Sequence, residues 1–219
     1  MPRRLVPVTP ARTPLQTGVL VVCLVTGFAT LLDSAVLSLA APALRDGLGA
    51  STAQLQWILA GYSLTFGLAL VPAGRLGDRY GRPWFLVAGL VLFALTSIVG
   101  ASAQDADVLV VARLVQGIGA GTANPQVIGL LQDHFEGPAR ARSLGAYAST
   151  GAFAAVIAPL VGGVVLAVAG PSGWRVSLLL TLPFALVAAA LCVRLVPRAD
   201  RAVRAAPGAS TRWVSRSSR

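Results

Sequence analysis

A single carboxylate, Asp33, lies inside an apolar stretch that is long enough to cross a lipid bilayer. A buried carboxylate can take up and release a proton. Ionisable residues in membrane segments face a bundle interior or a wet cavity, because hydrocarbon solvates charge poorly. Polar side chains recur around Asp33 every three or four residues, which places them on one face of a helix. The pattern predicts a cavity-lining stripe, or else a carboxylate hydrogen-bonded only for packing, that comprises Thr26, Thr30, Asp33, Ser34 and Ser38.

A second ionisable residue, Arg113, lies inside a later apolar stretch. At 1.5 Å of helical rise per residue, Asp33 would lie about 7 Å and Arg113 about 10 Å outward of the bilayer midplane, so an ion pair is geometrically allowed. The alternative for Arg113 is a side chain that snorkels to the outer surface. Gln116, one turn away, could orient the arginine, bind substrate or form an ordinary interhelical hydrogen bond. Gly117 and Gly121 favour close approach of another helix.

Charges and glycines also alternate at residues 74–82, between two apolar stretches. The glycines permit a tight turn, because they tolerate backbone conformations that a Cβ would penalise. The aspartate and the arginines can form ion pairs or cap helix ends. On residue types alone, the alternative is a plain basic loop. The residues predicted to act as a gating loop are Gly74, Gly77, Asp78, Arg79, Gly81 and Arg82.

The elements that must position these residues are membrane-spanning helices. Apolar residues make up 55% of the 219 residues and charged residues only 12%, which is the composition of a membrane protein. Six apolar stretches each have the length of a transmembrane helix. The sequence therefore predicts an all-α, polytopic membrane protein with a six-helix bundle. The predicted spans are 18–40, 54–73, 84–103, 108–131, 143–169 and 174–196, with breaks at 42–51, 74–83, 104–107, 133–142 and 170–173.

Arginine placement predicts the orientation of the chain. Only Arg45 and Arg175 are assigned to the segments on one side of the membrane, whereas the loops on the other side and the two ends of the chain hold most of the arginines. Because cytoplasmic loops carry the excess of basic residues, both termini are predicted to be cytoplasmic in a plasma membrane. The predicted organisation is a cytoplasmic segment at 1–14, a transmembrane domain at 15–196 and a basic, disordered cytoplasmic tail at 197–219.

Several classes of function are disfavoured by residue type. The chain has no lysine, so it has no Walker A loop for ATP, and His134 is its only histidine, which argues against a histidine-ligated metal centre. The positive charge follows membrane topology and does not indicate a nucleic-acid partner. We expect no metal, no cofactor and no enzymatic activity. The expected partners are small molecules, protons and the lipid bilayer.

These motifs together resemble the major facilitator superfamily, specifically the fourteen-helix drug:proton antiporters. Residues 32–36 look like that family's helix 1 signature, and residues 113–121 resemble its helix 4 motif. Residues 74–82 resemble the loop between helices 2 and 3. Residues 145–163 resemble the antiporter motif of helix 5, on the positions Gly145, Pro159, Gly162 and Gly163, with Ala154 and Ala158 where glycines are usual. The resemblance covers residues 15–196.

The resemblance implies two inverted three-helix repeats and proton-coupled efflux of small, amphipathic compounds. Asp33 and Arg113 would carry the proton and its counter-charge, and Thr30, Ser34, Ser38 and Gln116 would line the substrate cavity. Members of the family have two six-helix halves, whereas this chain matches one. It would act with a C-terminal half or as a homodimer. The alternatives are a transport-incompetent fragment and a membrane scaffold or interaction protein.

Overall fold

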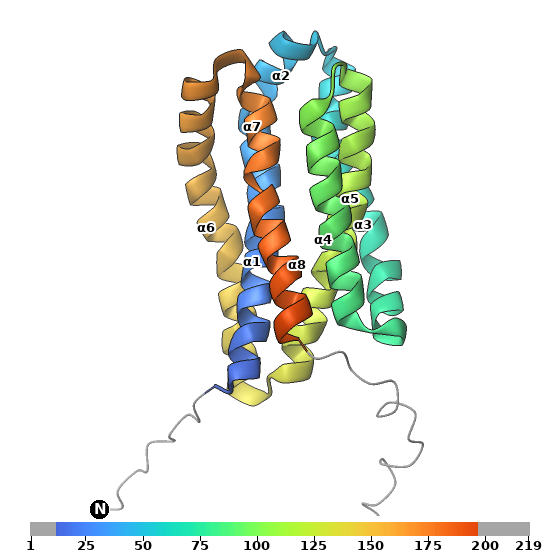
Figure 1. Ribbon diagram of the computed structural model, residues 1–219, viewed down its shortest axis with the longest axis vertical. Helices are drawn as coiled ribbons and strands as arrows, with labels where there is room; N and C mark the ends of the chain where they lie inside the picture. The colour runs from blue at the N-terminus through green and yellow to red at the C-terminus, as the bar shows by residue number, and fades with distance from the viewer. Residues whose placement is uncertain (1–11, 197–219) are drawn as a thin grey trace, which may run out of the picture.

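The computed structural model of the chain describes residues 12–196, and the predictions for residues 1–11 and 197–219 lie outside this range. Its elements are helices that run nearly parallel or antiparallel in one bundle (Figure 1). In chain order they are α1 (Pro14–Leu39), α2 (Ala41–Leu48), α3 (Thr52–Tyr80), α4 (Arg82–Ser102), α5 (Ala106–His134), α6 (Gly137–Ala169), the short η1 (Gly170–Ser172), α7 (Gly173–Leu180) and α8 (Leu182–Leu195).

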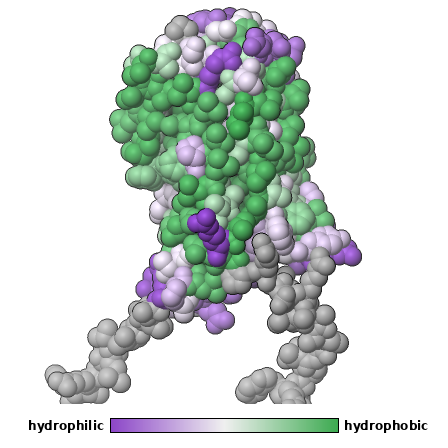
Figure 2. Space-filling model, in the orientation of Figure 1, coloured by the Kyte–Doolittle hydropathy of each residue, from purple (hydrophilic) through white to green (hydrophobic). Residues whose placement is uncertain are grey.

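Six helical segments within residues 12–196 are long and apolar enough to cross a membrane, with α7 and α8 forming one span from Gly173 to Leu195. On the face seen in Figure 2, apolar residues cover the middle of the bundle, and hydrophilic residues gather towards its two ends. The predicted all-α, six-helix membrane bundle is confirmed. Three of the long helices, α1, α3 and α5, begin at a short polar side chain, Thr13, Ser51 or Asp105, which accepts a hydrogen bond from a backbone N–H group that has no helical partner.

The helices are longer than hydropathy predicts. The expected break at 74–83 is wrong, because α3 continues through Gly74 and Gly77 and ends only at Gly81, whose positive φ of 115° closes the helix. The break at 133–142 shrinks to Phe135 and Glu136, and most of 42–51 forms α2. A helix of 29 residues spans about 44 Å, well beyond a hydrocarbon core of about 30 Å. Hydropathy detects only the part inside the hydrocarbon and misses the polar helix ends.

The packing order places α1 and α5 at the centre of the bundle. Helix α5 packs between α3 and α4, while α1 packs against α6 and α8 and also touches α5. The pairing of α3 with α5 is mirrored by that of α6 with α1, as two three-helix repeats would require. Both α1 and α5 therefore present side chains to the interior, which is where the ionisable residues of the two helices lie.

Small residues allow α5 to approach both of its flanking helices. A Cβ on Gly121 would lie 3.0 Å from the Cβ of Ala69 on α3. On the other side of the helix, a Cβ on Gly119 would lie 2.8 Å from the backbone nitrogen of Phe93 on α4. Backbone contact on two faces leaves no room for larger side chains. The close approach expected from Gly117 and Gly121 is present, with α3 as the partner helix.

Candidate functional site

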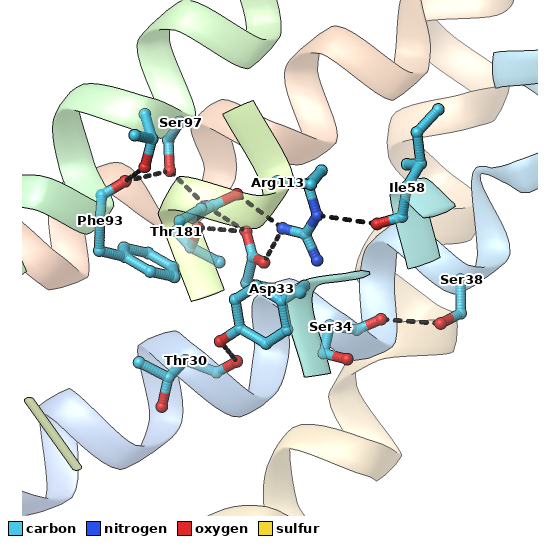
Figure 3. A network of polar contacts seen from close by, with 12 residues as sticks. Thr30, Asp33, Ser34, Ser38, Ile58, Phe93, Ser97, Arg113 and Thr181 are labelled. Atoms are coloured by element: carbon cyan, nitrogen blue, oxygen red, sulfur yellow. Dashed lines mark hydrogen bonds and ion pairs between the residues drawn. The ribbon is translucent and has the colours of Figure 1, made fainter. Parts of the chain in front are cut away.

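Asp33 of α1 and Arg113 of α5 meet in the centre of the bundle. The Nη1 atom of Arg113 lies 2.5 Å from Oδ2 of Asp33, and the side chain of each residue is only 1% exposed. Figure 3 shows the guanidinium group and the carboxylate facing one another between the helices. The structure thus brings together the two ionisable residues that the sequence singles out, and Arg113 does not snorkel to the surface.

The remaining donors of Arg113 are directed at fixed acceptors. Its Nε atom donates to the carbonyl oxygen of Ile58 at 3.3 Å, and Nη1 also donates to Oε1 of Gln116 at 2.7 Å. The guanidinium carbon lies 4.4 Å from the centre of the Tyr62 ring, within the range of a cation–π contact. Helix α3 thus contributes a carbonyl group and an aromatic ring to a charge carried by α5.

Asp33 accepts hydrogen bonds from two further side chains. Its Oδ1 atom accepts from Nε2 of Gln116 at 3.2 Å and from Oγ1 of Thr181 at 3.3 Å. Gln116 Nε2 also donates to Oγ of Ser97 at 2.8 Å. Gln116 therefore contacts both members of the ion pair, so its orienting role has direct geometric support. Thr181 lies at the junction of α7 and α8. The network around the two charges therefore draws on five of the six spans of the described residues, with only α6 contributing no group.

Three of these partners, Tyr62, Ser97 and Thr181, were not among the residues predicted from sequence. Each lies in an apolar span, and spacing along one helix cannot reveal a partner on another. The sequence gives only one indication of their role: burying a polar group that forms no hydrogen bond is costly, so each should have a partner. That indication does not say which residue the partner is.

The predicted cavity residues divide into two groups. Thr30 is buried, its backbone oxygen accepts from the Tyr62 hydroxyl at 3.3 Å, and its Oγ1 accepts from Asn124 at 3.3 Å. Ser34 and Ser38 lie elsewhere on α1, where the Ser38 hydroxyl donates to the Ser34 backbone oxygen at 2.8 Å (Figure 3). Neither serine joins the ion-pair network among the hydrogen bonds of the described residues. Their role in a substrate cavity stays a prediction.

A buried ion pair of this kind depends on both of its charges. Two charges leave water only at a cost of several kcal/mol each, which their mutual attraction and added hydrogen bonds must offset. Adding a proton to Asp33 removes the negative charge and leaves Arg113 uncompensated in an apolar interior. Loss of the Asp33 charge would therefore disfavour this packing of α1 against α5.

A second ionic cluster holds together the ends of three helices at the side where α1 begins. Arg82 at the start of α4 lies 2.7 Å from Asp78 of α3, through Nη2 and Oδ1. Its Nε atom lies 3.1 Å from Oδ2 of Asp133 near the end of α5. Gly129 makes room for this guanidinium group, because a Cβ there would collide with Arg82. Asp78 and Arg82 belong to the predicted gating segment, whereas Asp133 and Gly129 were not predicted.

The glycines and proline of the helix 5 motif occupy different environments on α6. A Cβ on Gly162 would lie 3.2 Å from Leu39 of α1, whereas one on Gly145 or Gly163 would meet no atom within 4 Å. Pro159 lies inside the helix. Ala154 and Ala158, each 1% exposed, also pack on α1, so small size is used here for contact between two helices.

The fold and its buried ion pair define a polytopic membrane protein of the transporter type. Residues 23–218 match the family model described as Major Facilitator Superfamily. The chain belongs to the major facilitator superfamily. Families of this kind contain transporters and no enzymes, in agreement with the expectation from sequence.

Several curated relatives are exporters or resistance proteins. The chain is 37% identical over 175 residues to a "Probable actinorhodin transporter" of Streptomyces coelicolor, covering 80% of this chain and 30% of the relative. It is 34% identical over 206 residues to a "Methylenomycin A resistance protein" of the same organism, covering 93% of this chain and 43% of the relative. A "Cephamycin export protein CmcT" of Amycolatopsis lactamdurans is 32% identical, with 85% and 38% covered. The chain thus spans less than half the length of these relatives.

Solved structures support the fold. A bacterial homologue of the human lysosomal transporter Spinster, in an inward-facing and occupied conformation, matches with a TM-score of 0.75 and 18% identity, over 87% of this chain and 46% of that one. A proton:xylose symporter, XylE, matches with a TM-score of 0.74 and 19% identity, over 84% of this chain and 45% of that one. At this level of identity the likeness concerns the fold alone.

Proposed function

We propose that this chain forms one half of a proton-coupled efflux transporter for small, amphipathic compounds. The observation that carries the proposal is the ion pair of Asp33 and Arg113, whose side chains are each 1% exposed in the interior of the bundle. Protonation of Asp33 breaks the pair, and the binding of substrate competes with it. Proton entry and substrate exit are then linked through the packing of α1 against α5.

The relatives favour export as the direction of transport. The names of three of them refer to export of, resistance to or transport of antibiotics, and each matches this chain over at least 80% of its length. We take the substrates of this chain to be amphipathic as part of the same proposal. The transmembrane spans of such a protein would bind them by apolar contact, with a few polar groups to fix their orientation. Thr30, Ser34, Ser38 and Gln116 supply the polar groups in this proposal.

The cluster around Arg82 would serve as the gate on the side where the chain begins. Asp78, Arg82 and Asp133 connect the ends of α3, α4 and α5 within this chain. These helix ends would then move together as a unit when the transporter changes conformation. Gly74, Gly77 and Gly81 shape the same segment, and Arg79 remains exposed beside it.

The proposed orientation places both termini in the cytoplasm of a plasma membrane. Because the arginines are concentrated on the side of the termini, a reporter active only in the cytoplasm should work when fused after Gly137, at the start of α6. The same reporter should be inactive after Ala50, between α2 and α3. The opposite pair of results would reverse the orientation.

Transport itself is testable in proteoliposomes that contain the chain together with a matching C-terminal half. With an acidic lumen, we expect uptake of a fluorescent quaternary cation, because protons leaving the lumen drive substrate in. A permanently charged cation cannot be trapped by pH alone. A protonophore should remove the uptake, and protein-free liposomes provide the background. Uptake that survives the protonophore would exclude proton coupling.

Two alternatives make different predictions in the same assay. A transport-incompetent fragment gives no uptake with any partner half. A membrane scaffold or interaction protein also gives none, and in addition tolerates loss of Asp33 and Arg113 without effect on its own binding activity. A homodimer would give uptake without any added half.

A further inference from the structure

A long groove follows the outer surface of the bundle between α3 and α4, with α5 as its floor. Its volume is about 380 Å³. Leu68, Pro72 and Leu76 form one wall, and Phe85 lies on the α4 side. Ile118 lies on the floor and is 42% exposed, so the groove opens to the surroundings of the bundle and not to the buried ion pair.

The lining of the groove is apolar except for two threonines. The Thr65 hydroxyl donates to the backbone oxygen of Gly61 at 3.0 Å, and the Thr122 hydroxyl donates to that of Ile118 at 2.8 Å. Both hydroxyl protons are therefore used within their own helices. The groove consequently suits a hydrocarbon chain, and it lies at the depth where α3 crosses the membrane.

A cation lies at the end of the groove nearest the chain termini. Pro72, Leu76 and Arg79 are spaced by four and three residues, so they lie on one side of α3. The guanidinium carbon of Arg79 lies 5.3 Å from the centre of the Tyr80 ring, and that ring stacks on Phe85 at 6.5 Å. The apolar wall of the groove, the aromatic rings of Tyr80 and Phe85, and the positive charge of Arg79 thus follow one another along the same surface.

This positive charge is not neutralised within the described part of the chain. Arg79 is exposed and forms no ion pair with any carboxylate of residues 12–196, and the same holds for the neighbouring Arg75. Asp78, the nearest acid in sequence, pairs with Arg82. An anion brought to Arg79 therefore meets an available guanidinium group, which can form two parallel hydrogen bonds to phosphate oxygens.

We propose that this groove is a binding site for an anionic membrane phospholipid, with an acyl chain along α3 and the phosphate group on Arg79. A phospholipid joins a hydrocarbon chain to a negative headgroup at the membrane surface, which is the order of features along the groove. The aromatic rings of Tyr80 and Phe85 then lie at the interface between the two, where such rings are favoured. The bound lipid fills the space between α3 and α4 and neutralises Arg79.

The test compares lipids retained by the purified full chain. Phosphatidylglycerol and phosphatidylcholine with identical acyl chains are supplied in equal amounts in detergent, and native mass spectrometry counts the lipid that stays bound. We expect phosphatidylglycerol to be favoured, and Arg79→Gln to reduce that preference about fivefold, the effect of one basic residue near a membrane surface. Arg142→Gln, which removes another exposed arginine at the same end, should leave it unchanged.

Filling the groove tests the acyl-chain part of the site. Ile118→Trp and Leu68→Trp should each lower retention of both lipids, and both residues are exposed, so the bundle has room for the new ring. Val168→Trp on α6, at a position that is 83% exposed and outside the groove, is the matched control and should retain lipid as the unmodified chain does. A melting curve is measured for each variant. If Ile118→Trp does not fold, the result for Leu68→Trp alone tests the acyl-chain part of the site. Equal retention of the two lipids by the unmodified chain, an unchanged preference in Arg79→Gln, or full retention in Leu68→Trp would overturn the proposal.

Discussion

Replacing Asp33 by asparagine is expected to abolish proton-driven transport while the protein still inserts into the membrane. Asparagine keeps the shape and can still accept the hydrogen bonds of Gln116 and Thr181, but it carries no charge and takes up no proton. Arg113 then lacks its counter-charge in an apolar interior. Breaking a buried ion pair by removing one partner costs about 3–5 kcal/mol of stability, so we also expect a lower melting temperature.

The measurement is uptake of the quaternary cation into acid-loaded proteoliposomes, beside a melting curve for each variant. Asp33→Glu restores the charge and should recover part of the transport. The double variant Asp33→Asn with Arg113→Gln removes both charges, so it should recover stability without recovering transport. Asp107→Asn, at an exposed carboxylate near the start of α5, is the matched control and should behave as the unmodified chain does. Full proton-driven uptake by Asp33→Asn would remove this residue from the mechanism.

The double variant separates the two readings that sequence alone leaves open for Asp33. If the carboxylate serves only packing, stability and activity should return together once both charges are gone. If it carries the proton, a stable bundle should remain uncoupled. Uptake, and not the melting temperature, therefore decides between a structural and a functional carboxylate.

Much of the fold follows from the sequence because membrane helices obey simple rules. Backbone polar groups must be satisfied inside hydrocarbon, so apolar stretches of sufficient length form helices. The composition and the six apolar stretches therefore predict the class of fold. The polar helix ends escape the same reasoning, which is why α3 extends to Tyr80 beyond its predicted end at residue 73.

The site is harder to predict than the fold, because its partners come from different helices. Asp33 and Arg113 stand out, since each is an ionisable residue in an apolar span, and estimated depth allows them to meet. Tyr62, Ser97 and Thr181 complete the network, and nothing in the spacing along their own helices relates them to Asp33. Similarly, nothing in the sequence around Gly129 indicates that the absence of a side chain there makes room for Arg82. Such relations arise only when packing fixes which helices are neighbours.

The chain by itself, as a monomer, is expected to be inactive, and a matching C-terminal half should restore transport. Alternating access requires two units that rock against one another around a central site. The chain matches less than half the length of its curated relatives, and its six spans form one unit. Helices α3 and α6 are mostly exposed, with Val71 on α3 and Val164 on α6 both more than half exposed. Lipid can cover these faces, but it supplies no second wall for a substrate cavity.

The comparison is made between proteoliposomes with the chain alone and with both halves, at equal amounts of this chain. The oligomeric state is determined in the same membranes by cross-linking, because a homodimer would provide two units from one sequence. The Asp33→Asn chain paired with the same C-terminal half is the control, since it should assemble equally well without coupling. Uptake that requires the C-terminal half supports the proposal that the chain is half of a transporter. Uptake that requires only a dimer of this chain would show that a second copy serves as the partner. Robust proton-driven uptake by a verified monomer would show that one six-helix unit suffices, and would overturn the proposed division of the site between two halves.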